Sequence, residues 1–172
     1  NQGMLHGFHG NTGVEHLAFV PNLAIQAGMA EYASPDYEHK YLLDGEITVA
    51  DVYGGTPARW RTVLVGTMGR GGQGIYALDV TDPNNVEYLW ERNATQIPAL
   101  GQNLGKPIIA QVANGTWRVI LGNGPNSSGN RAQLVMVNIF TGNVTTVDTN
   151  VGGSNGLTAV QAWDSTQDGF AD

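Results

Sequence analysis

The last nine residues of the sequence place oxygen-bearing side chains at alternating positions of a short loop. The run is Asp164-Ser165-Thr166-Gln167-Asp168-Gly169-Phe170-Ala171-Asp172, and its glycine permits a tight turn. Calcium takes about six to eight hard oxygen ligands, and alternate positions of a tightly turned loop point toward one centre. We therefore expect a calcium site completed by water, whose protein ligands are the side chains of Asp164, Thr166, Asp168 and Asp172 and the backbone carbonyl of Phe170.

This pattern resembles the first part of an EF-hand loop, although its final acid, Asp172, comes earlier than in the EF-hand. The shorter form suits a hairpin between two strands. The alternative interpretation is an Asp-rich turn that is simply solvated. Thr166 is a weaker ligand than Asp or Asn at that position.

Other residues that could carry chemistry have simpler explanations. His6 and His9 are three residues apart, so on a strand they point to opposite faces, which favours histidines at a junction between structural units over metal ligands. The Gly-rich run at 69–74 precedes a strand pattern, whereas phosphate-binding loops open a helix. The run is therefore interpreted as a flexible loop between strands and not as a nucleotide-binding site. The chain has no Cys and no Gly-x-Ser-x-Gly motif, and we expect no enzymatic activity.

The elements that would position the loop form a repeat of short strands. Runs of alternating side chains end in Thr-Gly or Asp-Pro turns and resume as a second short run, which predicts hairpins. A strand that starts with Trp-Arg precedes two of these hairpins. Another short strand precedes each Trp-Arg strand, and a third such strand precedes Trp163. The predicted hairpins begin at 5–13, 75–83 and 134–142, the Trp-Arg strands span 60–66 and 117–122, and the preceding strands span 45–50, 105–110 and 156–162.

Four short antiparallel strands per unit, repeating at about 40 to 60 residues, predict an all-β fold of the β-propeller class. A single blade cannot cover both of its faces, so neighbouring blades must stack. We expect residues 1–172 to be a segment of a single β-propeller domain, partial and worth about three four-stranded antiparallel blades. A short helical insertion is expected at about 24–41, where Ile25, Met29 and Tyr32 have helical spacing.

The composition excludes several classes of partner. The formal net charge is −7, and the 8 Lys and Arg residues do not cluster, which argues against binding to nucleic acid or to an anionic membrane surface. The longest apolar runs are too short to span a bilayer. Trp60, Trp90, Trp117 and Trp163 recur at matching positions of the repeat, which favours packing between blades over stacking on sugars.

The order of these motifs resembles the C-terminal β-propeller of the PilY/PilC type IV pilus proteins. The resemblance covers nearly the whole chain, although any single hairpin is generic. The segments that carry it are Met4–Phe8, Trp60–Gly66, Gly74–Pro83, Leu89–Glu91, Gly105–Pro107 and Trp117–Gly124.

This resemblance implies export to the outer membrane, cell surface and pilus of a Gram-negative bacterium. It implies a non-enzymatic role in pilus assembly, adhesion and twitching motility, with pilins and the assembly machinery as partners. The host-cell surface would be contacted through regions outside this chain. The family binds calcium in a short Asp-rich loop, matched here by Asp164, Thr166, Asp168, Phe170 and Asp172, and its occupancy tunes pilus extension against retraction. Thr166 departs from the family pattern, which has Asp or Asn there.

Two other functions remain open at this point. Tyr76-Ala77-Leu78-Asp79 and Trp90 also resemble the propeller repeats of quinoprotein dehydrogenases. The hairpins are uneven, however, and no set of quinone-binding residues is visible. A lectin-like propeller that stacks sugars on Trp side chains is the third option.

Overall fold

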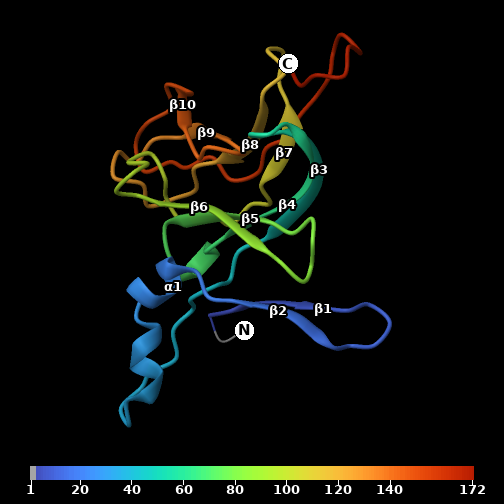
Figure 1. Cartoon of the computed structure of the whole chain (residues 1–172). Coiled ribbons are helices and arrows are strands. Elements are labelled where there is room, and N and C mark those ends of the chain that lie inside the picture. Colours follow the sequence, from blue (N-terminus) through green and yellow to red (C-terminus); the bar gives the residue numbers. More distant parts are fainter. Residues whose placement is uncertain (1–2) are drawn as a thin grey trace.

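The computed structural model describes residues 3–172, and within them the chain forms ten β-strands, one α-helix and two short 3₁₀ helices (Figure 1). The strands are β1 (Leu5–Phe8), β2 (Glu15–Phe19), β3 (Ile47–Gly54), β4 (Arg59–Thr67), β5 (Gly74–Asp79), β6 (Glu87–Asn93), β7 (Ile108–Gln111), β8 (Trp117–Gly122), β9 (Gln133–Asn138) and β10 (Val144–Asp148). The helices are α1 (Asn22–Gln26), η1 (Met29–Ala33) and η2 (Gly69–Gly71). Among these described residues, no helix is long and apolar enough to cross a membrane.

The strands form two four-stranded antiparallel sheets and one two-stranded hairpin. The sheets run in chain order, β3-β4-β5-β6 and β7-β8-β9-β10, and within residues 3–172 β1 pairs only with β2. Successive strands joined by hairpins are the arrangement of a propeller blade. The predicted all-β class, the hairpins and the four-strand unit are therefore confirmed.

The main core lies between the two four-stranded sheets. Val63 and Val65 of β4 face Val119 and Val135 of the other sheet, and all four side chains are fully buried. The side-chain period of two sends alternate residues of each strand to this core. The Trp90 indole also crosses the junction, where its Nε1 donates a hydrogen bond of 2.9 Å to the carbonyl of Ile139. Burial of both facing surfaces holds the sheets together.

The opposite face of the β3–β6 sheet is covered by the N-terminal part of the chain. Leu64, Tyr76 and Leu78 form a second buried cluster, against which Leu17 and Phe19 of the β1–β2 hairpin pack. This sheet is thus apolar on both faces, as expected of a blade with neighbours on each side.

The predicted helical insertion is present, and α1 begins at Asn22, two residues before the expected boundary. The Glu91 carboxylate on β6 accepts the backbone amides of Asn22 and Leu23 at 3.0 and 3.1 Å, which fixes the start of α1 on the blade. These amides have no partner within the helix, so a carboxylate there satisfies them. Figure 1 shows the insertion projecting away from the sheets.

The expected strand at 156–162 does not form, because no strand of the described chain pairs with it in a ladder. Instead, the Leu157 amide donates to the Asn123 side chain at 3.0 Å and the Leu157 carbonyl accepts the Gly124 amide at 2.7 Å. Only glycine permits this approach to β8, since a Cβ at Gly122 would lie 2.2 Å from the Leu157 oxygen. The segment is held in place as extended chain.

The tryptophans only partly follow the predicted packing role. Trp90 is buried and Trp117 packs against the same core, whereas Trp60 and Trp163 are 64% and 74% exposed. Matching sequence positions therefore do not imply matching burial. Trp60 lies on the face of β4 turned away from the main core, where its ring lies beside that of Tyr53, at 5.6 Å between ring centroids.

A buried ion pair joins β4 to the end of β5. The Arg61 guanidinium donates to the Asp79 carboxylate at 2.9 Å, and both side chains are more than nine-tenths buried. Burial alone would raise the pKa of Asp79, but hydrogen bonds from Thr81 and Arg61 hold it below the usual range. The carboxylate is therefore ionised in the folded chain.

We predict that Asp79→Asn destabilises the protein by about 2–3 kcal/mol near neutral pH, because Arg61 loses its closest counter-charge in a buried site. Glu87, at 3.7 Å from Arg61, keeps the loss below that of an isolated buried charge. The folded pKa is depressed, so this contribution is complete above about pH 4 and is lost as the pH falls through the lower folded value. Denaturant unfolding at several pH values measures both effects.

Asp148→Asn is the matched control, since it breaks an ion pair that is exposed. Its Oδ2 accepts the Arg131 guanidinium at 2.7 Å on the surface. Exposed pairs contribute little to stability, so this variant should unfold like the wild type. Equal destabilisation by the two substitutions would contradict the role given to the buried pair.

Candidate functional site

The predicted calcium loop lies at the end of the described chain, beyond the β7–β10 sheet (red in Figure 1). Its two ends meet, because the Asp172 amide donates to the Trp163 carbonyl at 3.0 Å. Asp164 is half-buried, whereas Thr166, Asp168 and Asp172 are exposed. The segment is thus a closed loop on the surface and not a free tail.

The chain turns around the carboxylate of Asp164. Its Oδ1 accepts the amide of Asp168 at 3.2 Å, and its Oδ2 accepts the amide of Gly169 at 2.8 Å. Gln167 and Gly169 have φ values of 60° and 90°. The left-handed region costs glycine little, so Gly169 serves the tight turn predicted from the sequence.

The other two carboxylates bond within the loop. Asp168 Oδ1 accepts the Phe170 amide at 3.0 Å, which is a local side-chain turn. Asp172 Oδ2 accepts both the amide of Ser165, at 2.8 Å, and the Ser165 hydroxyl. These two hydrogen bonds lower the pKa of Asp172 and keep it ionised.

Ser165 is a functional candidate that the sequence pattern did not identify. Ser165 lies between the predicted ligands Asp164 and Thr166, so the alternating pattern gives it no ligand role. It is nevertheless the residue that bonds the side chain of Asp172. The sequence signal that could have identified Ser165 was a hydroxyl side chain directly after Asp164, the first predicted ligand. By bonding Asp172 Oδ2, Ser165 draws the end of the loop back to its beginning.

The returning end of the loop is attached to the β7–β8 hairpin. The Ala171 amide donates to the Gln111 carbonyl at 2.8 Å, and Ala171 forms a parallel bridge with Val112. A cleft of about 640 Å³ lies between this part of the loop and the outer face of the sheet, lined by Ile120 and Met136 among others. The loop is therefore connected to the blade at a defined point.

The donors fit calcium in their chemistry, because all five predicted ligands are hard oxygens. In this structure the carboxylates are engaged with loop amides and with Ser165. Among residues 3–172, no group of three or more His, Asp or Glu side chains is arranged so that it could hold a metal ion. The loop brings its acids into one turn without gathering them around a single point.

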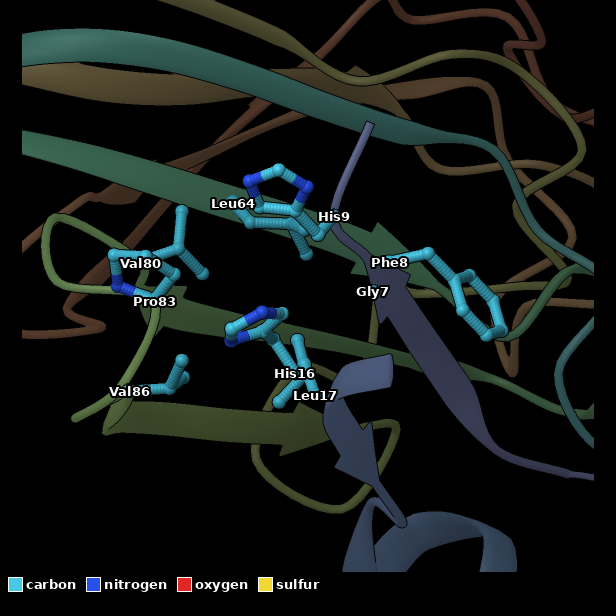
Figure 2. A pocket seen from close by; sticks show the side chains of 9 residues that line it. All are labelled: Gly7, Phe8, His9, His16, Leu17, Leu64, Val80, Pro83 and Val86. Atoms are coloured by element: carbon cyan, nitrogen blue, oxygen red, sulfur yellow. The ribbon is translucent and has the colours of Figure 1, made fainter. Parts of the chain in front are cut away.

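His9 and His16 line an apolar pocket between the β1–β2 hairpin and the β3–β6 sheet. Figure 2 shows His9 and His16 on the hairpin side and Val80, Pro83 and Val86 on the other. The two imidazole centroids are 5.8 Å apart, and His9 Nδ1 accepts the amides of Asn11 and Thr12. His6 instead pairs with Glu15. The positions agree with the predicted junction role.

Comparison with known proteins identifies the family. The family model described as "PilY1 beta-propeller domain" matches residues 1–172, the whole chain. The chain belongs to the PilY1 β-propeller family. A solved structure, the C-terminal domain of Pseudomonas aeruginosa PilY1, superposes with a TM-score of 0.80 at 39% identity, which confirms the partial propeller. The match covers 100% of this chain and 34% of the solved chain.

Full-length PilY1 relatives extend far beyond this chain. A type IV pilus biogenesis factor PilY1 homolog of Xylella fastidiosa is 49% identical over 172 residues, and PilY1 of P. aeruginosa strain PAO1 is 39% identical over 178. The matches cover 100% of this chain but only 14% and 15% of those relatives. The chain is therefore similar to one section of a much larger protein.

We predict that Ser165→Ala raises the pKa of Asp172 toward the ordinary value of an Asp carboxyl, because the hydroxyl hydrogen bond that favours the ionised form is removed. Titration of the side-chain carboxyl by NMR measures this shift. Ser154→Ala, in an exposed turn outside the loop, should leave the Asp172 titration unchanged. An unshifted Asp172 in Ser165→Ala would show that the hydroxyl does not hold it.

Proposed function

We propose that this chain is a non-enzymatic, calcium-binding β-propeller module of a type IV pilus biogenesis and adhesion protein, and that calcium at its Asp-rich loop regulates pilus extension and retraction. The observation that carries the proposal is the closed loop at 164–172, with hard oxygen donors only, in a member of the PilY1 β-propeller family. The ligands would be Asp164, Thr166, Asp168, Phe170 and Asp172, as the alternating pattern predicts.

The loop's own hydrogen bonds support the proposal, because they would order part of the site before calcium binds. Asp164 holds the turn through the amides of Asp168 and Gly169, and Ser165 holds the final acid near the first. These bonds limit the conformations that the unliganded loop can adopt, so less ordering remains to be done on binding. Bound calcium, with two positive charges, would offset two of the three negative charges that Asp164, Asp168 and Asp172 carry.

The loop is suited to a regulatory role because it is exposed and attached to the β7–β10 sheet at a defined point. Binding to the folded loop and not to the unfolded chain stabilises the folded form by mass action. A change in the loop would be presented on the surface, where pilins or the assembly machinery are the partners we propose. The relatives named as type IV pilus biogenesis factors support an exported protein associated with the pilus of a Gram-negative bacterium.

We predict that Asp168→Ala abolishes measurable calcium binding by the full-length protein at this loop, because it removes a central carboxylate ligand. Isothermal titration calorimetry with calcium chloride is the measurement. Asp36→Ala removes an exposed acid from the insertion and should bind calcium as the wild type does. Calcium binding that survives Asp168→Ala at wild-type strength would remove this loop as the site.

In cells, we expect Asp168→Ala to alter the balance of pilus extension and retraction, seen as changed surface piliation and twitching motility. Asp36→Ala, expressed at the same level, is again the control. Unchanged piliation and motility in cells whose Asp168→Ala protein has lost calcium binding would contradict the regulatory role. The calcium site itself would stand in that case.

A further inference from the structure

One peptide group belongs both to the predicted calcium site and to the attachment of the loop. The carbonyl of Phe170 is a predicted ligand, and the amide of the same peptide unit, on Ala171, donates to the Gln111 carbonyl at 2.8 Å. A trans peptide is planar, with its C=O and N–H on opposite sides. While the amide points to β7, the carbonyl must therefore point away from it.

The orientation of this ligand carbonyl is thus set by the blade and not by the loop alone. Gln111 is the last residue of β7, and the bridge between Val112 and Ala171 reinforces the same contact. A hydrogen bond to the N–H also polarises the C=O of the same peptide, which strengthens it as an acceptor. The neighbouring residue, Asp172, is the last predicted ligand.

The β7–β8 hairpin that provides this anchor has a turn that depends on one glycine. Gly115 has a φ of 74°, its amide donates to the Val112 carbonyl at 2.7 Å, and its carbonyl accepts Gln111 Nε2 at 2.9 Å. The turn closes with a 3.0 Å bond from the Val112 amide to Thr116. The residues that hold the loop are therefore the residues that close the turn.

We propose that the Phe170–Ala171 peptide couples calcium binding to the β7–β8 hairpin, so that calcium stabilises the hairpin and an intact hairpin increases calcium affinity. The coupling rests on the calcium site proposed above. It is reciprocal by thermodynamic necessity, since two events that share one interaction must influence each other equally. The hairpin also forms one wall of the cleft beside the loop. Calcium binding would therefore also stabilise this wall of the cleft.

Gly115→Ala tests the coupling without touching a ligand. An added Cβ would have only one contact, at 3.8 Å from the Gln111 side chain, so the change acts through the positive φ and not through a collision. We expect calcium binding by the full-length protein to weaken by about five- to thirtyfold, in line with the cost of a left-handed residue. Titration calorimetry measures the change.

Gly13→Ala is the matched control. Gly13 has a φ of 69° in the β1–β2 turn, and a Cβ there would meet nothing within 4 Å. The φ is similar to that of Gly115, but this hairpin packs on the β3–β6 sheet, whereas the loop is attached to the β7–β8 hairpin. Calcium affinity should be unchanged.

Hydrogen exchange in the wild-type protein provides a second test that needs no variant. Calcium should slow exchange several-fold at the amides of 111–118 and leave those of the β1–β2 hairpin unaffected. Normal calcium binding by Gly115→Ala, together with unchanged exchange at 111–118, would overturn the coupling and leave the calcium site intact. Absence of calcium binding by the wild type would overturn the proposed function and the coupling with it.

Discussion

The structure depends on the fact that no sheet in it can cover its own faces. The β3–β6 sheet is apolar on both sides, and it is buried only because the β7–β10 sheet packs on one face and the β1–β2 hairpin on the other. The Trp90 indole adds a directional contact across the first junction, since its N–H must meet the Ile139 carbonyl. Burial supplies the attraction, and this hydrogen bond helps to fix how the sheets are aligned.

The same constraint explains how much of the fold the sequence could predict. Period-two alternation and turn residues are local, so hairpins such as 75–83 with its following strand, and the four-strand unit, were predicted correctly. The strand predicted at 156–162 does not form, because a strand requires a partner strand and the alternating pattern does not show whether one is present. Trp60 was misjudged for a similar reason, since its burial depends on what lies opposite it.

The candidate site was predictable in its donors but not in its supports. Alternating oxygen side chains and Gly169 identify a tight loop, and the chain does turn around Asp164 there. The contact of Ala171 with Gln111 is made by backbone groups alone. The contact of Ser165 with Asp172 involves a residue between two predicted ligands, to which the alternating pattern gives no role. Backbone contacts leave no trace in residue identity, so only the folded chain reveals that the loop is closed and attached to the blade.

The attachment of the helical insertion has a consequence for how this protein can diverge. Glu91 holds α1 through the backbone amides of Asn22 and Leu23, which every residue except proline possesses. The anchor therefore depends on the position of the backbone and not on the side chains of Asn22 and Leu23. The exposed part of the insertion can change its surface chemistry freely while its point of origin on the propeller stays fixed.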